Sequence, residues 1–150
     1  MSIQSVALDA CVLRDLEIGD DEDVLTNVDV ISDLRDRGLP LAVDFEHHIL
    51  NEYFRVLQPN SLGRRFLTSC IRRSVILYTA GKLAHKHMEA LNRHRFDPND
   101  IPYLAVARET EGLYVTSEEK HLRPNRRQFV LETCGVEIVT LHELGEIIGR

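Results

Sequence analysis

The sequence has little of what stabilises a secreted or membrane protein. Its 150 residues include no tryptophan, 6% aromatic residues and three cysteines, Cys11, Cys70 and Cys134. An odd number of distant cysteines without a Cys-x-x-Cys pair argues against a disulfide framework and a thiolate zinc site. No apolar stretch approaches the ~20 residues of a membrane span. The first apolar run stops at Asp9, before the core of a signal peptide could form. We therefore expect a cytoplasmic protein.

What the sequence does contain is typical of one globular domain. The chain is 43% hydrophobic and 28% charged, which is ordinary for a soluble protein. Its length of 150 residues is sufficient for one hydrophobic core but not for two. We predict a single domain over residues 1–150.

Charge is segregated along the chain, although the net charge is only −6. Residues 1–58 have 4 basic and 13 acidic side chains, residues 64–95 have 8 and 1, and residues 96–150 have 6 and 10. A basic stretch beside clustered carboxylates can attract phosphates while the carboxylates hold a divalent cation. The alternative is that the basic stretch is merely a solvated helix face.

Short apolar runs alternate with helical patterns. We predict strands at 5–8, 39–43, 113–116 and 136–139. We predict helices at 24–37, at 45–57 with Asp44 as N-cap, over 62–92 as one or two helices broken near Gly81, from the turn at 97–100 to Glu109, and at 141–148. This alternation implies an α/β fold, a three-layer α/β/α sandwich with a central, mainly parallel sheet.

Acidic residues stand where such a sheet forms its sites, at the carboxyl ends of strands. Asp9 closes the first strand, Asp100 begins a late helix, and Glu118 follows the next strand. Each could instead occupy the N-terminus of a helix for structural reasons, as a cap or a favourable charge. Glu52 lies at the border of the apolar stripe of its helix, where a carboxylate needs a partner.

With this order of acids, the chain resembles a PIN-domain ribonuclease over nearly its whole length. The matching stretches are 6–13, 49–57, 100–107 and 114–122, followed by a closing strand and short helix from Gly135. Two positions depart from the family pattern. Cys11 stands where the family commonly has Asn, and Glu118 or Glu119 stands where the fourth acid is usually Asp; we favour Glu118.

The resemblance implies a metal-dependent endoribonuclease that hydrolyses RNA phosphodiester bonds. Asp9, Asp100 and Glu118 would hold Mg²⁺ or Mn²⁺, the ions that oxygen ligands select over zinc, and Glu52 would orient the attacking water. Thr116 and Ser117 would contact the scissile phosphate. The resemblance also allows a homodimer and leaves open whether the protein is a toxin with an antitoxin-type partner.

Four cationic residues are candidates for gripping the RNA backbone. They recur at spacings of ten, four and seven, which would keep them near one stripe of a helix: Arg72, Lys82, Lys86 and Arg93. Such contacts would make binding salt-dependent and indifferent to sequence. His121 matches a histidine often seen in the family, but packing or hydrogen bonding is its simpler role.

The main alternative is a PIN-like module that has weakened catalysis and binds RNA or a protein partner. Cys11 and the glutamate at the fourth acidic position favour it. A phosphoacceptor signalling domain fits poorly, because the acidic cluster at 20–23 is too far beyond the first strand to join a pocket there.

Overall fold

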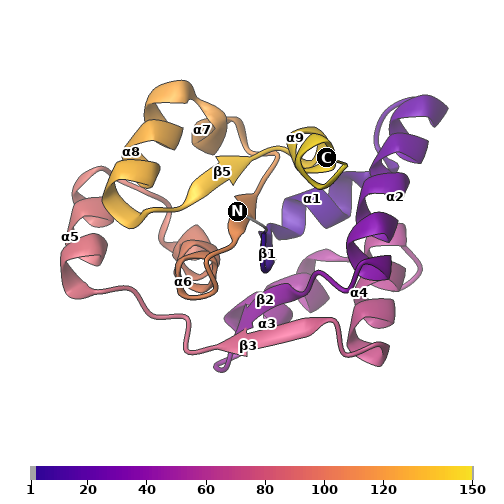
Figure 1. Ribbon diagram of the computed structural model, residues 1–150, viewed down its shortest axis with the longest axis horizontal. Helices are drawn as coiled ribbons and strands as arrows, with labels where there is room; N and C mark the ends of the chain where they lie inside the picture. The colour runs from indigo at the N-terminus through magenta and orange to yellow at the C-terminus, as the bar shows by residue number, and fades with distance from the viewer. Residues whose placement is uncertain (1–2, 150) are drawn as a thin grey trace.

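The computed structural model, which describes residues 3–149, is a three-layer α/β/α sandwich (Figure 1). In this part of the chain, five strands form one sheet in the order β3-β2-β1-β4-β5, and all neighbouring strands are parallel. The strands are β1 (Val6–Leu8), β2 (Leu41–Asp44), β3 (Ile76–Thr79), β4 (Leu113–Val115) and β5 (Glu137–Val139). The predicted fold class is confirmed.

Helices cover both faces of the sheet, so the three central strands are fully buried. On one side lie α1 (Ala10–Arg14), α2 (Asp21–Asp36), α4 (Leu62–Arg72) and α9 (Leu141–Ile148) (Figure 1). On the other lie α5 (His85–Arg93), α6 (Ile101–Glu109), α7 (Glu119–Leu122) and α8 (Pro124–Cys134) (Figure 1). Helix α3 (His48–Val56) packs on β2, and two 3-10 turns, η1 (Asp15–Glu17) and η2 (Pro98–Asp100), complete the described chain. None of the helices within residues 3–149 is long and apolar enough to span a bilayer.

Residues 62–92 do contain two helices with a break that includes Gly81, but the prediction missed strand β3, which separates α4 from α5. Helix α4 ends in a turn in which Ser74 has a φ of 57°. Glycine usually occupies this left-handed position, so a serine there gives no stop signal in the sequence. Strand β3 is also an edge strand with exposed Leu77 and Tyr78, and it lacks the burial pattern of its neighbours. Helix α8 was not predicted either.

The N-cap of α3 is His47 and not Asp44 as predicted, but the side chain of Asp44 still accepts from the first turn of the helix. Its carboxylate accepts hydrogen bonds from the backbone N–H groups of His48 and Ile49, each at 3.0 Å. Burial opposes ionisation, but these hydrogen bonds hold the pKa of Asp44 below its ordinary value.

The strand order makes the carboxyl ends of β1 and β4 the switch point of the sheet. From β1 the chain moves outward to β2 and β3, then returns to β4 on the other side and continues to β5. The connections after β1 and β4 therefore diverge, and such a switch point leaves room for a site between them. Asp9 and the segment 116–118 follow these two strands.

Candidate functional site

Asp9 is fixed at the switch point by contacts to both of its carboxylate oxygens. It directly follows β1 and is 4% exposed. Oδ1 accepts from the backbone N–H of Cys11 at 3.2 Å, so Asp9 does cap α1. Oδ2 accepts from the hydroxyl groups of Tyr114 at 2.5 Å and Thr116 at 3.1 Å. Capping therefore accounts for one oxygen only, and the other is held by residues of β4 and the connection after it.

Three buried tyrosines surround the turn at Asp9, a feature that the sequence analysis missed. Tyr53 donates to the backbone carbonyl before Asp9 at 2.5 Å, and Tyr103 accepts from the backbone N–H after it at 3.2 Å. Tyr114 contacts the carboxylate itself. Burial, together with the charge of Asp9, raises the pKa of all three hydroxyl groups well above the ordinary value. They therefore stay neutral and orient Asp9 throughout the physiological pH range.

Asp100 is buried, and its side chain does not cap α6. Its Oδ2 lies 2.7 Å from Nε2 of His121, which is 2% exposed. The imidazole ring also stacks on Phe96, with ring centroids 4.6 Å apart. The prediction that His121 serves packing and hydrogen bonding is confirmed, whereas the capping interpretation of Asp100 is wrong.

Glu118 connects Asp9 with Asp100. Within the described residues, two groups have potential metal-ligand atoms that all lie within 4.8 Å of one another: Asp9, Cys11 and Glu118, and Asp100, Glu118 and His121. Glu118 belongs to both groups and makes no capping hydrogen bond to α7, whereas Glu119 is exposed and belongs to neither. The geometry therefore favours Glu118 as the acid at this position.

A cationic side chain already lies among these carboxylates. Nζ of Lys120 is 2.7 Å from Asp97, 3.1 Å from Glu118 and 3.8 Å from Asp100. The hydrogen bond to Asp97, with support from Glu118, raises the pKa of Lys120 above its ordinary value. An ammonium group in this place reduces the repulsion between the acids. The space between these carboxylates thus suits a positive charge.

The donor set fits a divalent cation that prefers oxygen. Carboxylate oxygens are the ligands that Mg²⁺ and Mn²⁺ prefer, and each of the two groups contains two carboxylates with oxygens within 4.8 Å of each other. Asp9, Glu118 and Asp100 would hold Mg²⁺ or Mn²⁺, and the ammonium of Lys120 would have to move aside.

Glu52 lies outside both groups of closely spaced ligands. Its side chain is 32% exposed and pairs with Arg55 at 2.9 Å, on the same helix. Arg55 is therefore the partner that a carboxylate at the border of an apolar stripe requires. Tyr53, the neighbour of Glu52 on α3, contacts the turn at Asp9.

Cys11 replaces the expected asparagine with a weakly polar contact. Its Sγ accepts from the hydroxyl of Ser117 at 3.1 Å and lies 3.8 Å from Oγ1 of Thr116. Burial, and then the charge of Asp9, raises the pKa of Cys11 to about 11. The thiol is therefore neutral at pH 7.

Thr116 and Ser117 differ in their access to a phosphate. Thr116 is fully buried, and its hydroxyl donates to Asp9 and accepts from the backbone N–H of Glu118 at 3.2 Å. Thr116 therefore positions Asp9, and its predicted contact with the scissile phosphate stays a prediction. Ser117 is exposed, and its contact with phosphate stays a prediction.

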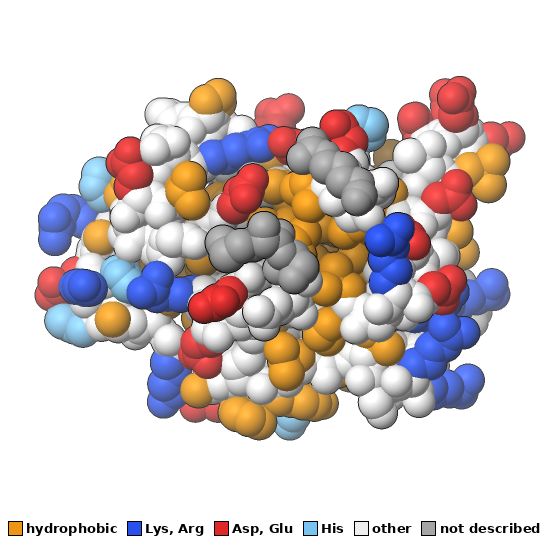
Figure 2. Space-filling view, viewed as in Figure 1, with side chains coloured by type: hydrophobic (Ala, Val, Ile, Leu, Met, Phe, Trp, Pro, Cys, Tyr) orange, Lys and Arg blue, Asp and Glu red, His pale blue; other side chains and the backbone are white. Residues whose placement is uncertain are grey.

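The predicted basic stripe is divided between two edges of the sheet. Arg72 ends α4 just before β3 begins, which places it at the amino edge, opposite Asp9. Lys82 follows β3, and Lys86 and Arg93 lie on α5. Because β3 interrupts the helix, the four residues do not share one stripe. Figure 2 shows acidic side chains gathered over α2, with Lys and Arg side chains over α4 and α5.

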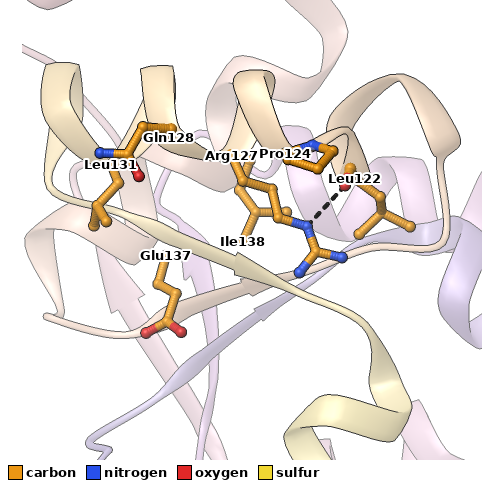
Figure 3. A pocket seen from close by; sticks show the side chains of 7 residues that line it. All are labelled: Leu122, Pro124, Arg127, Gln128, Leu131, Glu137 and Ile138. Carbon is orange, nitrogen blue, oxygen red and sulfur yellow. Dashed lines mark hydrogen bonds between the residues drawn. The ribbon is translucent and has the colours of Figure 1, made fainter.

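A separate hollow of about 480 Å³ lies between α8 and β5, away from the carboxylates (Figure 3). The guanidinium of Arg127 in its wall donates to the backbone carbonyl of Leu122 at 2.9 Å and to the carboxylate of Glu143 at 3.0 Å. Its cationic group is thus occupied by protein contacts, and this hollow offers no chemistry comparable to that around Asp9.

Comparison with models of known families, with curated proteins and with solved structures found no match. The function of the site must therefore be argued from its geometry.

Proposed function

We propose that the protein is a Mg²⁺- or Mn²⁺-dependent endoribonuclease with a PIN-like domain. The observation that supports this proposal is that Glu118 lies close to Asp9 on one side and to Asp100 on the other, at the switch point of a parallel sheet. Two of the three acids are buried, and a lysine ammonium group lies beside the cluster. Buried carboxylates in such proximity favour binding of a cation.

The residues of the chain have separate tasks in this proposal. A divalent cation supplies Lewis-acid activation of the phosphodiester and of the attacking water. Tyr114 and Thr116 hold the carboxylate of Asp9 in one orientation, and His121 does the same for Asp100. Glu52 is the remaining acid near the turn, and its task is to orient the water for attack.

Cleavage of single-stranded RNA in the presence of Mn²⁺ tests the proposal. Asp9→Asn and Asp100→Asn should each lower the rate by more than about 100-fold, beyond the 10–100-fold typical of an outer-sphere partner. Glu119→Gln is the matched control, since it removes an exposed acid beside the cluster. Titration calorimetry should show Mn²⁺ binding to the control and the loss of that binding in both Asn variants. Equal cleavage by all four proteins would refute the proposal.

The second candidate is a module that binds RNA or a protein partner without cutting RNA. The ion pairs of Lys120 favour it, because they reduce the repulsion within the cluster without a metal ion. RNA that is bound but stays intact in Mn²⁺ would support this module over the nuclease.

A further inference from the structure

A basic hollow adjoins the carboxylate cluster on the side of α5 and α8. Its volume is about 330 Å³, within the range of pockets that hold small ligands, and its lining is Arg95, Phe96, Asp97, Lys120, His121 and Arg126. Two of these side chains also contact the cluster, since Lys120 lies 3.1 Å from Glu118 and His121 lies 2.7 Å from Asp100. The hollow is thus separated from the candidate metal ligands by single side chains.

The cations of this hollow are only partly neutralised by the protein. Arg126 donates to the backbone carbonyl of His94 from both terminal nitrogens, each at 3.2 Å, and its guanidinium lies 5.9 Å from the ring centroid of Phe96. These contacts hold the group in place without cancelling its charge. Within residues 3–149, neither Arg95 nor Arg126 pairs with a carboxylate. Asp97 is the one acid in the lining, and it pairs with Lys120.

A guanidinium group has five N–H donors in a planar fork and is suited to a phosphate. Arg126 uses part of this capacity for one carbonyl, and the side chain of Arg95 has no hydrogen bond within the described chain. An anion in the hollow would therefore meet donors that are positioned and available. The carboxylates of the adjoining cluster would repel this anion less strongly once a divalent cation is bound among them.

A comparable hollow at the amino edge shows why position matters. It has a volume of about 340 Å³ and is lined by Arg65, Arg72 and Arg73 among others. Arg73 pairs with Asp36 at 2.9 Å, and Arg72 lies at the end of the sheet opposite Asp9. A single-stranded RNA held in this second hollow would not pass over the carboxylates around Asp9.

We propose that the hollow of Arg95 and Arg126 binds a phosphate of single-stranded RNA next to the phosphate that is cut, an inference that rests on the proposed nuclease function. The strand then runs from the carboxylate cluster past Lys120 toward the end of α5. Arg72 takes no part in binding it.

Salt-dependent binding of a short fluorescein-labelled single-stranded RNA tests this path. The measurement is fluorescence anisotropy in EDTA with the wild-type protein as background, because without the divalent cation the proposed nuclease does not cut the RNA. Each phosphate contact contributes about 0.7 to the slope of log Kd against log salt, which corresponds to about fivefold in Kd at 0.1 M salt. Arg95→Gln with Arg126→Gln removes both donors to this one phosphate and should lower the slope by about 0.7 and weaken binding about fivefold.

Arg65→Gln with Arg72→Gln is the matched control, because it removes the same charge from the other hollow. For this control, the slope of log Kd against log salt should equal that of the background protein. Arg126 has structural contacts, so Arg95→Gln alone is measured as well and should also lower the slope, by no more than about 0.7. Circular dichroism verifies that each variant is folded.

The outcomes separate the inference from the function on which it rests. Unchanged binding in the Arg95 variants overturns the inference, and so does weaker binding in the Arg65 and Arg72 control alone. If the wild-type protein still cuts RNA in either case, the proposed function stands. If the wild-type protein neither binds RNA nor binds Mn²⁺ in the absence of RNA, the proposed function and the inference both fail.

Discussion

Tyr114→Phe removes one hydroxyl group from the centre of the candidate site. Oδ2 of Asp9 then loses its 2.5 Å hydrogen bond and keeps the one from Thr116 at 3.1 Å. The ring remains, and with it the stacking on Tyr103 at a centroid distance of 5.6 Å. A hydrogen bond to a charged group contributes about 1.5–3 kcal/mol. We therefore expect the free energy of unfolding to fall by that amount.

Urea unfolding at pH 7 in EDTA measures this change, and the slope with denaturant should stay the same. Tyr78→Phe is the matched control, since Tyr78 is 43% exposed on the edge strand. Its effect should stay within about 0.5 kcal/mol. In an Asp9→Ala background, Tyr114→Phe should cost much less, because the hydroxyl no longer has its charged acceptor.

Mn²⁺ affinity gives an independent measure of the same hydrogen bond. Loss of an outer-sphere partner typically weakens metal binding 10- to 100-fold, and we expect a change of this size for Tyr114→Phe. A loss of stability below 0.5 kcal/mol, or an equal loss for Tyr78→Phe, would refute the role of Tyr114 in holding Asp9.

Three further predictions concern Asp44, Lys120 and the cysteines. Asp44→Ala should lower the free energy of unfolding by about 2 kcal/mol at pH 7, because two backbone N–H groups lose their acceptor. Since the pKa of Asp44 is lowered by folding, its contribution is present above the unfolded pKa of about 4 and is lost as pH falls below it; acid titration of the wild type and the variant should converge there. Lys120→Met should tighten Mn²⁺ binding in calorimetry by removing a competing cation; unchanged or weaker affinity would contradict that competition. Burial raises the pKa of the three cysteines, Cys11, Cys70 and Cys134. Iodoacetamide at pH 7 should therefore label them only after unfolding. Rapid labelling of the folded protein would contradict their burial.

Much of the fold could be predicted because its signals are local. Four of the five strands in the described chain are short apolar runs that end at a polar residue, and α9 begins and ends where its pattern does. Strand β3 had no comparable signal, because half of it is exposed and Ser74 hides the end of the preceding helix. The unpredicted helix α8 lacks a continuous apolar stripe and buries only Val130 and Cys134 fully.

In the candidate site, too, some features could be read from local sequence and others could not. The sequence by itself determined which acids end β1, begin α6 and follow β4, since parallel strands bring their carboxyl ends to one edge. Only the tertiary structure decided that Tyr114, 105 residues away, holds Asp9, that Lys120 lies among the acids, and that Arg72 lies at the far edge. A local pattern specifies an element and the residue at its end. Which distant side chains meet there depends on strand order and packing, which no local pattern contains.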